Sequence, residues 1–386
     1  MRASLRRRVI ALASFASFGA SLSYFTTNPI FPLWAKQLGA GVGVIGLIFM
    51  VQWLLQVILR PIMGALSDGY GRRLFMFSAL TGYGAAQILY GLATCPEHLI
   101  AARALQALAI SALWPALFAS VGDVGGKGRE LGVTLVTMDL GAILGGIVCA
   151  ALVEELGRRT LFWLGGAFGL VAAALVMILM PEPLQERREV GLRIVLQEFA
   201  SIPQIWKRDR RFAIASITVA LASAGLAVFA AFYPLLGEQV GLADPEIALV
   251  QVVVPITTLA LRVPSGVLVD RVGGPPLFCI GLLSLSSALA LFPVAASALH
   301  SVLSVGVGVG MGFVATPTLR AATRGAERGL RAGIWGFSMT LGRGASVYGF
   351  GVIGDLWGLA TAFWTAAFVS LVGLLTVYVL RPRSSA

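Results

Sequence analysis

The chain has 386 residues, of which 58% are hydrophobic and 12% are charged, and its mean hydropathy is +0.87. Too few polar residues are present to cover a water-soluble surface, so the composition excludes a soluble globular protein and predicts an integral membrane protein. The net charge of +11 is spread over several predicted loops, which argues against a nucleic-acid partner.

Apolar stretches long enough to cross about 30 Å of hydrocarbon as a helix occur along the whole chain. They predict an all-α integral membrane fold of twelve transmembrane helices, arranged as two pseudo-symmetric six-helix bundles. In chain order the predicted spans are 9–34, 43–67, 74–94, 97–121, 130–153, 160–181, 211–236, 247–269, 276–296, 299–322, 330–353 and 358–380.

The first span follows a basic segment, Arg6 to Arg8, a pattern that cleavable signal peptides share. We interpret it as a retained helix, because the apolar run continues past position 30 without a clear small-residue cleavage site. Most of the 29 basic residues fall in the N-terminal tail, the central linker and alternate loops. The positive-inside rule therefore predicts a multi-pass inner-membrane protein whose two termini and linker are cytoplasmic.

A polar segment divides the chain into two halves. We predict an N-terminal bundle over 1–181, a cytoplasmic linker over 182–210 and a C-terminal bundle over 211–386. Within the linker, apolar residues between 192 and 199 predict a short amphipathic helix that lies at the membrane interface.

One sequence motif occurs once in each half. The pattern Arg-x-x-x-Gly-x-Leu-x-Asp-x-x-Gly begins at Arg60 and again at Arg262, each time at the end of a long apolar stretch. Pro115 and Pro317 are separated by the same interval. A pattern repeated in register indicates that the two bundles arose by duplication.

The first copy, which continues into Arg72 and Arg73, resembles the loop signature that the major facilitator superfamily carries between its second and third spans. The twelve spans, the linker and the weaker second copy, which lacks the basic pair, extend the resemblance over the whole chain. The resemblance implies a gating latch that closes in one state of a transport cycle. Its predicted residues are Gly64, Asp68, Gly71, Arg72, Arg73, Gly266 and Asp270.

Two charged residues inside spans are candidates for proton coupling. Arg103 with Gln106 resembles the fourth-span motif of the family, whose arginine takes part in proton transfer in proton-coupled members. The alternative is that Arg103 extends to the membrane interface. Asp139 lies roughly 15 Å from the cytoplasmic end of its span, so it is expected to be protonated, paired or in a wet cavity. A static ion pair with Arg262 or Arg343 is the alternative to a titrating role.

Three further arginines, Arg60, Arg262 and Arg343, lie inside spans and leave an excess of positive charge that favours an anion. Arg262 and the two residues after it resemble the eighth-span motif of monocarboxylate and nitrate transporters in the superfamily, whose arginine contacts the anion. The alternative is that these arginines only solvate the latch region.

The segment from Asn28 to Pro32 resembles the end of the first span in the twelve-span drug:proton antiporter branch. Thr137 and Ala142 depart from the fifth-span motif of that branch. Aromatic and amide residues on helices expected to line a cavity are further candidates for substrate contact. The residues predicted to bind substrate are Arg60, Arg262, Arg343, Tyr24, Asn28, Gln52, Gln56, Trp114, Tyr233, Gln251 and Trp335.

The cysteines and histidines show no metal-binding pattern. The three cysteines are scattered through or beside apolar segments, so neither a disulfide framework nor a metal site is expected. His98 and His300 occupy corresponding loops of the two halves and are predicted to cap helices at the interface.

The sequence contains no paired-carboxylate site and no phosphate-binding glycine loop, so we expect a secondary transporter rather than an enzyme. We expect a monomer that uses a proton gradient and no cofactor, and whose partners are protons, a small-molecule substrate and the lipid bilayer. The leading hypothesis is rocker-switch efflux of amphipathic, drug-like compounds. The alternatives are transport of a small organic anion, and a non-transporting sensor or lipid flippase.

Overall fold

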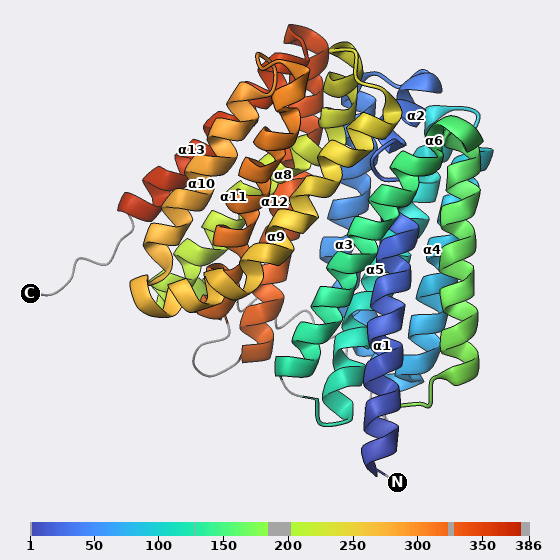
Figure 1. Ribbon diagram of the computed structural model, residues 1–386. Helices are drawn as coiled ribbons and strands as arrows, with labels where there is room; N and C mark the ends of the chain where they lie inside the picture. Colours follow the sequence, from blue (N-terminus) through green and yellow to red (C-terminus); the bar gives the residue numbers. More distant parts are fainter. Residues whose placement is uncertain (1, 127, 184–201, 323–327, 380–386) are drawn as a thin grey trace, which may run out of the picture. The chain divides into compact units, whose positions relative to one another are not determined.

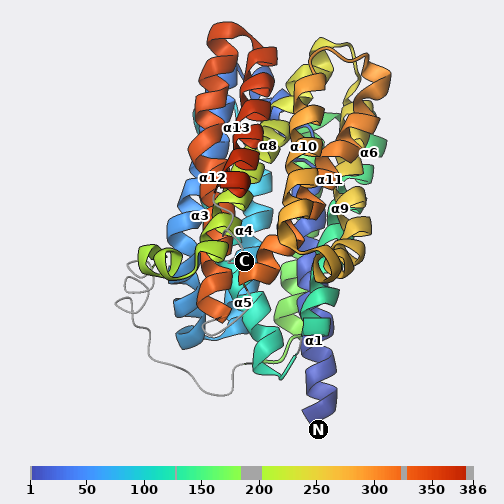
Figure 2. The ribbon, with the colours of Figure 1, turned by 90° about the vertical axis from the view of Figure 1, so that its left-hand side faces the viewer.

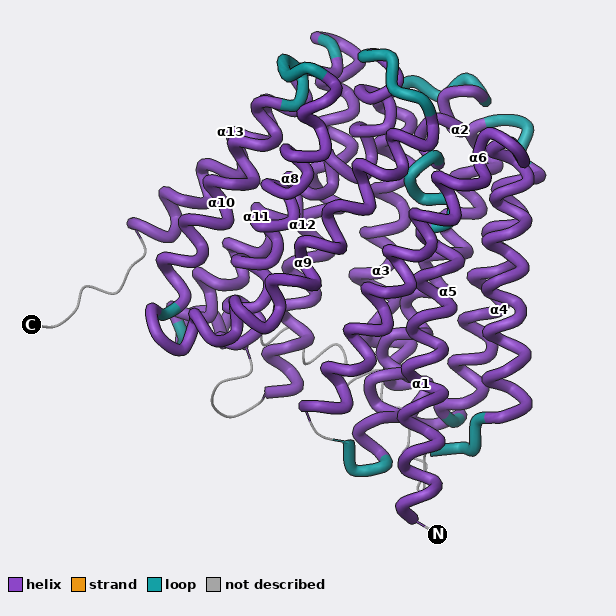
Figure 3. Tube along the Cα trace, in the orientation of Figure 1, coloured by secondary structure: helices purple, strands orange, loops and turns teal. Residues whose placement is uncertain are grey.

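The computed structural model describes residues 2–126, 128–183, 202–322 and 328–379. The described residues form helices and loops without strands (Figure 3). The helices, labelled in Figure 1, are α1 (Arg2–Phe25), α2 (Phe31–Gln37), α3 (Val42–Tyr70), α4 (Arg72–Leu92), α5 (Pro96–Asp123), α6 (Gly128–Leu179), α8 (Arg210–Gln239), α9 (Asp244–Val272), α10 (Gly274–Leu291), the 3₁₀ helix η1 (Ser297–Leu299), α11 (His300–Ala322), α12 (Arg328–Trp357) and α13 (Leu359–Val379).

The helices form two compact units. Unit 1 comprises Met1–Ala40, Leu55–Val195 and Asp244–Val252, and unit 2 comprises Gly41–Leu54, Leu196–Ala243 and Val253–Ala386. Helices α3 and α9 are therefore each divided, so that the first turns of each belong to a different unit from the rest.

In unit 1, α1 packs along α6, and α4 packs between α5 and α6 (Figure 1). Glycines permit the close approach of α1 and α6. A Cβ atom at Gly141 would lie 2.4 Å from the carbonyl oxygen of Phe18, and one at Gly145 would lie 2.8 Å from that of Leu22. Small residues bring helix backbones together where lipid provides no hydrophobic driving force, so this pair of glycines fixes the position of the first helix.

In unit 2, α8 packs against α12 and α13, and α10 packs against α11 and α13 (Figure 2). The first turns of α3 belong to this unit. The Asp355 carboxylate accepts hydrogen bonds from the N–H groups of Val42 at 2.8 Å and Gly43 at 2.7 Å. This carboxylate thus caps the α3 N-terminus, where N–H groups lack partners and the helix dipole favours a negative charge.

Each of the twelve predicted spans falls largely on a helical segment, with one difference in continuity. The first predicted span breaks after Phe25, and the chain turns through Thr26–Ile30 before α2 begins with Pro32 in its first turn. The fifth and sixth predicted spans are the two helical parts of α6, which are separated by a kink at Gly157, whose φ of 74° is not helical. By length and apolar composition alone, eight of the described helices could cross a membrane.

The predicted linker is described only at its ends. Residues 202–208 are helical, whereas the amphipathic helix predicted between 192 and 199 lies outside the described residues.

Candidate functional site

Arg103 is enclosed by aromatic rings in unit 1. Its side chain is only 1% exposed. The guanidinium carbon lies 3.7 Å from the centre of the Phe31 ring and 5.4 and 5.9 Å from those of Tyr90 and Tyr24. A cation within about 6 Å of a ring face is stabilised by the ring quadrupole. We name Tyr24, Phe31 and Tyr90 the aromatic box.

An amide joins the arginine to the box. Gln106 Oε1 accepts a hydrogen bond from Arg103 NH1 at 2.8 Å and another from the Tyr90 hydroxyl at 3.0 Å. One acceptor therefore serves both the charged side chain and the phenol. The short α2, which begins at Phe31 after the turn, brings its ring onto the guanidinium.

The other predicted substrate residues of unit 1 lie near the turn after α1, on α3 or on α5. Asn28 is 7% exposed, and its Oδ1 has no hydrogen-bond partner among the described residues. Gln251 donates from Nε2 to the carbonyl oxygen of Pro29 at 3.0 Å, so it is tied to the same turn. Trp114, on α5, stacks on Phe118 at a centroid separation of 5.9 Å.

Asp139 is buried on α6, with 6% exposure. Seven residues later on the same helical face lies Gly146, where an added Cβ would come within 2.2 Å of Val252. This face therefore points toward the first turns of α9 in unit 1.

Three predicted anion-binding arginines are half-buried. Arg60 on α3 donates from NH2 to Gln56 Oε1 at 2.6 Å. Arg262 lies on α9 and Arg343 on α12, both in unit 2.

The first motif copy forms a network inside unit 1 whose centre is Arg72, 6% exposed. Arg72 forms an ion pair with Asp68 and donates from Nε to Asp123 Oδ2 at 3.0 Å. The Glu182 carboxylate accepts from the N–H groups of Arg72 at 2.9 Å and Arg73 at 3.2 Å. Negative charge at this helix N-terminus is favoured by the α4 dipole.

The backbone conformation at the start of α4 requires a glycine. Gly71 has φ 107°, and a Cβ there would lie 2.8 Å from Glu182 Oε2. The chain therefore turns sharply between α3 and α4 and leaves the N–H groups open to the carboxylate. The first motif glycine, Gly64, lies one turn before Asp68, and a Cβ there would make an ordinary contact with Pro115 at 3.5 Å.

The second motif copy obtains its cation from another helix. Asp270 on α9 forms an ion pair with Arg320 on α11, and Arg320 also donates to the Gly266 carbonyl oxygen at 3.4 Å. The copy lacks a basic pair after Gly273, and Arg320 supplies the positive charge in unit 2 instead.

Three predicted substrate residues remain in unit 2. Gln52 is 1% exposed, and its Oε1 lacks a hydrogen-bond partner among the described residues. Trp335 donates from Nε1 to Thr318 Oγ1 at 2.9 Å. Tyr233 is fully buried, and its hydroxyl lies 3.3 Å from Nδ1 of His300.

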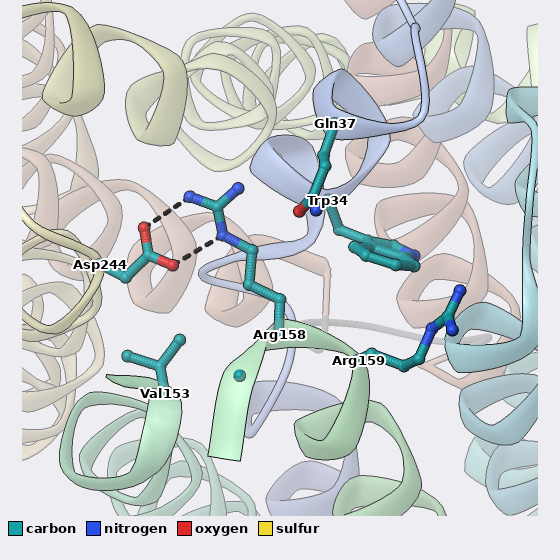
Figure 4. A pocket seen from close by; sticks show the side chains of 7 residues that line it. Trp34, Gln37, Val153, Arg158, Arg159 and Asp244 are labelled. Carbon is teal, nitrogen blue, oxygen red and sulfur yellow. Dashed lines mark hydrogen bonds and ion pairs between the residues drawn. The ribbon is translucent and has the colours of Figure 1, made fainter. Parts of the chain in front are cut away.

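An open pocket of about 560 Å³ lies in unit 1, beside the turn at Gly157 (Figure 4). Arg158 crosses it to the Asp244 carboxylate, and the Arg159 guanidinium lies 5.6 Å from the ring centre of Trp34. None of the predicted substrate residues lines it. The pocket is therefore separate from the predicted binding residues. Its charged residues Arg158, Arg159 and Asp244 contact other side chains of the protein.

Sequence reasoning did not assign Asp123, Glu182 or Arg320 to the motif network. Each lies at the end of a helix or just beyond it, next to a motif loop. The sequence does show a charged residue at the end of an apolar span. It does not show which other charged residue will lie beside it in the fold.

A family model, the Major Facilitator Superfamily, matches residues 13–222 and 215–386. The chain is 23% identical over 367 residues to an uncharacterised MFS-type transporter of Methanocaldococcus jannaschii, covering 90% of this chain and 92% of that protein. It is 25% identical over 337 residues to a probable 4-methylmuconolactone transporter of Cupriavidus pinatubonensis, with 83% and 77% coverage. It is 23% identical over 210 residues to the quinolone resistance protein NorA of Staphylococcus aureus, with 54% and 53% coverage.

Among solved structures, a mutant of the nucleoside transporter NupG matches with a TM-score of 0.78 at 16% identity, covering 98% of this chain and 100% of that one. This likeness bears on the fold alone and agrees with the predicted all-α membrane architecture. The chain is a multi-pass membrane transporter that belongs to the major facilitator superfamily.

Proposed function

We propose that this transporter exports small amphipathic, drug-like compounds and couples their movement to a proton gradient. The observation that carries the proposal is the enclosure of Arg103 by the aromatic box in the same unit as the buried Asp139. A fixed buried cation and a carboxyl group that can gain or lose a proton supply the two charges that proton exchange requires. The similarity to a quinolone resistance protein supports the substrate class.

The remaining assignments follow from this proposal. The energy source is the proton gradient, without a cofactor, and the protein works as a monomer in the inner membrane with its termini in the cytoplasm. The motif networks around Arg72 and Asp270 act as the gating latch. Asp139 binds the transported proton, and Arg103 takes part in proton coupling.

A second candidate function is transport of a small organic anion. The half-buried Arg60, Arg262 and Arg343 favour it, because guanidinium groups stay charged and bind carboxylates in a planar fork. The similarity to a probable muconolactone transporter points in the same direction.

Proton movement in sealed proteoliposomes distinguishes the two. Lipophilic cations and then small carboxylates are added to wild type, Asp139→Asn, Arg262→Ala and the control Glu155→Gln, which changes an exposed carboxylate of α6. Flux evoked by cations, lost in Asp139→Asn and kept in the control, supports export. Flux evoked by carboxylates and lost in Arg262→Ala supports anion transport. If neither cations nor carboxylates evoke proton flux, the two hypotheses that remain are a non-transporting sensor and a lipid flippase.

A further inference from the structure

His300 in unit 2 is buried, whereas its counterpart in the first half is exposed. The His300 side chain at the start of α11 is 0% exposed. His98, at the corresponding position, is exposed, and its Nδ1 accepts from the Thr94 N–H at 3.4 Å. Both histidines were predicted to cap helices at the membrane interface, and the structure distinguishes them by burying His300 and exposing His98.

Aromatic rings and hydrogen-bond acceptors surround the imidazole. Its Nδ1 lies 3.3 Å from the Tyr233 hydroxyl, and its ring meets those of Tyr233 and Phe292 edge to face, at centroid separations of 5.7 and 5.3 Å. The backbone carbonyls of Phe292 and Ala295 also lie beside the ring. Nε2 is buried without a hydrogen bond of good geometry to the described residues.

This arrangement repeats the aromatic box with a different nitrogen group. Phe31 and Tyr90 of the first half correspond to Tyr233 and Phe292 of the second, at the interval of the repeated motif. The centroid separations are 5.0 Å for the first pair and 5.2 Å for the second. The Tyr90 hydroxyl is linked to Arg103 through Gln106, whereas the Tyr233 hydroxyl contacts His300 directly. The first box encloses the permanent cation of Arg103, and the second encloses an imidazole, the side chain whose ordinary pKa is nearest to neutral pH.

The helices packed around His300 bring few charges to it. From α8, Tyr233 faces the ring, and Glu238 lies five residues further on, about 140° around the helix. In α10 the one titratable residue, Cys279, lies about 18 Å along the axis from that helix's end. Asp355 of α12 is engaged by the α3 N-terminus. The short η1 has no titratable residue, and α13 has none before position 378.

We propose that His300, with Tyr233 as its hydrogen-bond partner, is a second proton-binding site of the transport cycle, located in unit 2. In the neutral tautomer whose proton is on Nε2, Nδ1 accepts from Tyr233, and the buried Nε2–H lacks a hydrogen bond of good geometry to the described residues, which is unfavourable. When a proton binds at Nδ1, that atom donates to the Tyr233 oxygen, and the imidazolium faces π systems and carbonyl dipoles that stabilise a cation. Movement of α8 or α10 relative to α11 alters these contacts and thereby alters proton affinity.

The chain has only two histidines, so the site can be observed directly. In the His98→Gln variant, isotope-labelled His300 gives the only imidazole signal in an NMR titration of the protein in nanodiscs. We expect this signal to titrate between about pH 5 and 8, and to titrate at a different pH in Tyr233→Phe. A signal that stays constant across this range would show a structural histidine and overturn the proposal.

Coupling to transport rests on the proposed function and is measured separately. Addition of tetraphenylphosphonium to detergent-purified protein in weak buffer, with a pH indicator, reports protons released on binding. We expect His300→Gln and His300→Asn to reduce release at least about twofold between pH 6 and 7, while His98→Gln matches wild type. Melting temperatures identify any variant that fails to fold, and two histidine replacements of different size guard against that outcome.

The two hypotheses fail in different ways. If wild type and a folded His300→Gln variant release equal numbers of protons on tetraphenylphosphonium binding, His300 has no role in the transport cycle, even if its imidazole titrates. Release that is absent in wild type would overturn proton-coupled export of cations and with it the coupling role, whereas the NMR titration would still decide whether His300 binds a proton.

Discussion

Arg158 holds the carboxylate of Asp244 through two parallel hydrogen bonds, of 2.7 Å from Nε and 2.8 Å from NH2 (Figure 4). The arginine follows the turn at Gly157 in α6, and the aspartate is the first residue of α9. The two side chains are 21% and 19% exposed, so water screens the pair only partly. This fork attaches the first turns of α9 to unit 1, while the α9 dipole adds to the stabilisation of the carboxylate.

Removal of either partner is expected to destabilise the protein. Arg158→Gln and Asp244→Asn should each lower the free energy of unfolding by about 1–3 kcal/mol, and Arg158→Lys should not restore it, because an ammonium group cannot form the fork. Arg159→Gln, at the exposed neighbour, should cost less than about 1 kcal/mol. Thermal melting in nanodiscs measures these changes. The double variant should lose little more than either single one, and additive losses would contradict the account.

The equivalent motif glycines offer a matched comparison. Gly71 and Gly273 have φ of 107° and 80°, a region that side chains rarely enter, so alanine at either position should cost about 1–3 kcal/mol. Only at Gly71 would the new methyl group also displace the Glu182 carboxylate from the α4 N-terminus. We therefore expect Gly71→Ala to lower the melting temperature more than Gly273→Ala. Equal losses would show that the Glu182 cap contributes little.

Close packing of α1 on α6 should make Gly141 intolerant of a side chain. A Cβ there would meet the Phe18 carbonyl oxygen at 2.4 Å, so Gly141→Ala is expected to cost about 1–3 kcal/mol. Gly132 lies on the same helix with nothing within 4 Å of an added Cβ, so Gly132→Ala should leave the melting temperature unchanged or slightly raised. Similar losses in both variants would argue against backbone contact as the cause.

Asp209 should make stability depend on pH. Burial by itself raises the pKa of this carboxyl, but hydrogen bonds from the Phe212 N–H at 3.0 Å and from Arg331 outweigh burial, so the native pKa lies below its ordinary value. The unfolded chain therefore binds more protons, and the stabilisation is present above the unfolded pKa of about 3.9 and is lost as the pH falls through the native pKa. Melting temperatures between pH 6 and 3 should fall less steeply in Asp209→Asn than in wild type. Parallel curves would contradict this assignment.

The helical segments were predictable because lipid requires long apolar stretches, and each predicted span coincides with helix. The break after Phe25 was not predicted, although Pro29 and Pro32 signalled it. Hydropathy does not distinguish a continuous helix from two helices with an apolar turn between them. In contrast, the predicted boundary between the fifth and sixth spans coincides with the kink at Gly157 in α6.

Candidate site residues could be identified from the sequence, but their contact partners could not. A charged residue inside an apolar span is visible in sequence, as Arg103 and Asp139 were. The rings around Arg103 come from α1, α2 and α4, and only packing brings these segments together. The partners of Glu182 and Arg320 could not be predicted either, because they depend on which helix ends lie next to each other in the fold. Whether the nominated residues bind substrate or protons stays a prediction.

Accumulation of tetraphenylphosphonium in proteoliposomes with an inside-acid pH gradient and a membrane potential clamped at zero tests the proposed coupling most directly. The account predicts uptake above the passive level in wild type and in the control Glu155→Gln. It also predicts collapse of that uptake when the gradient is dissipated, and no uptake in Asp139→Asn. Uptake that does not depend on the gradient, or that persists unchanged in Asp139→Asn, would contradict proton-coupled export through this carboxyl group.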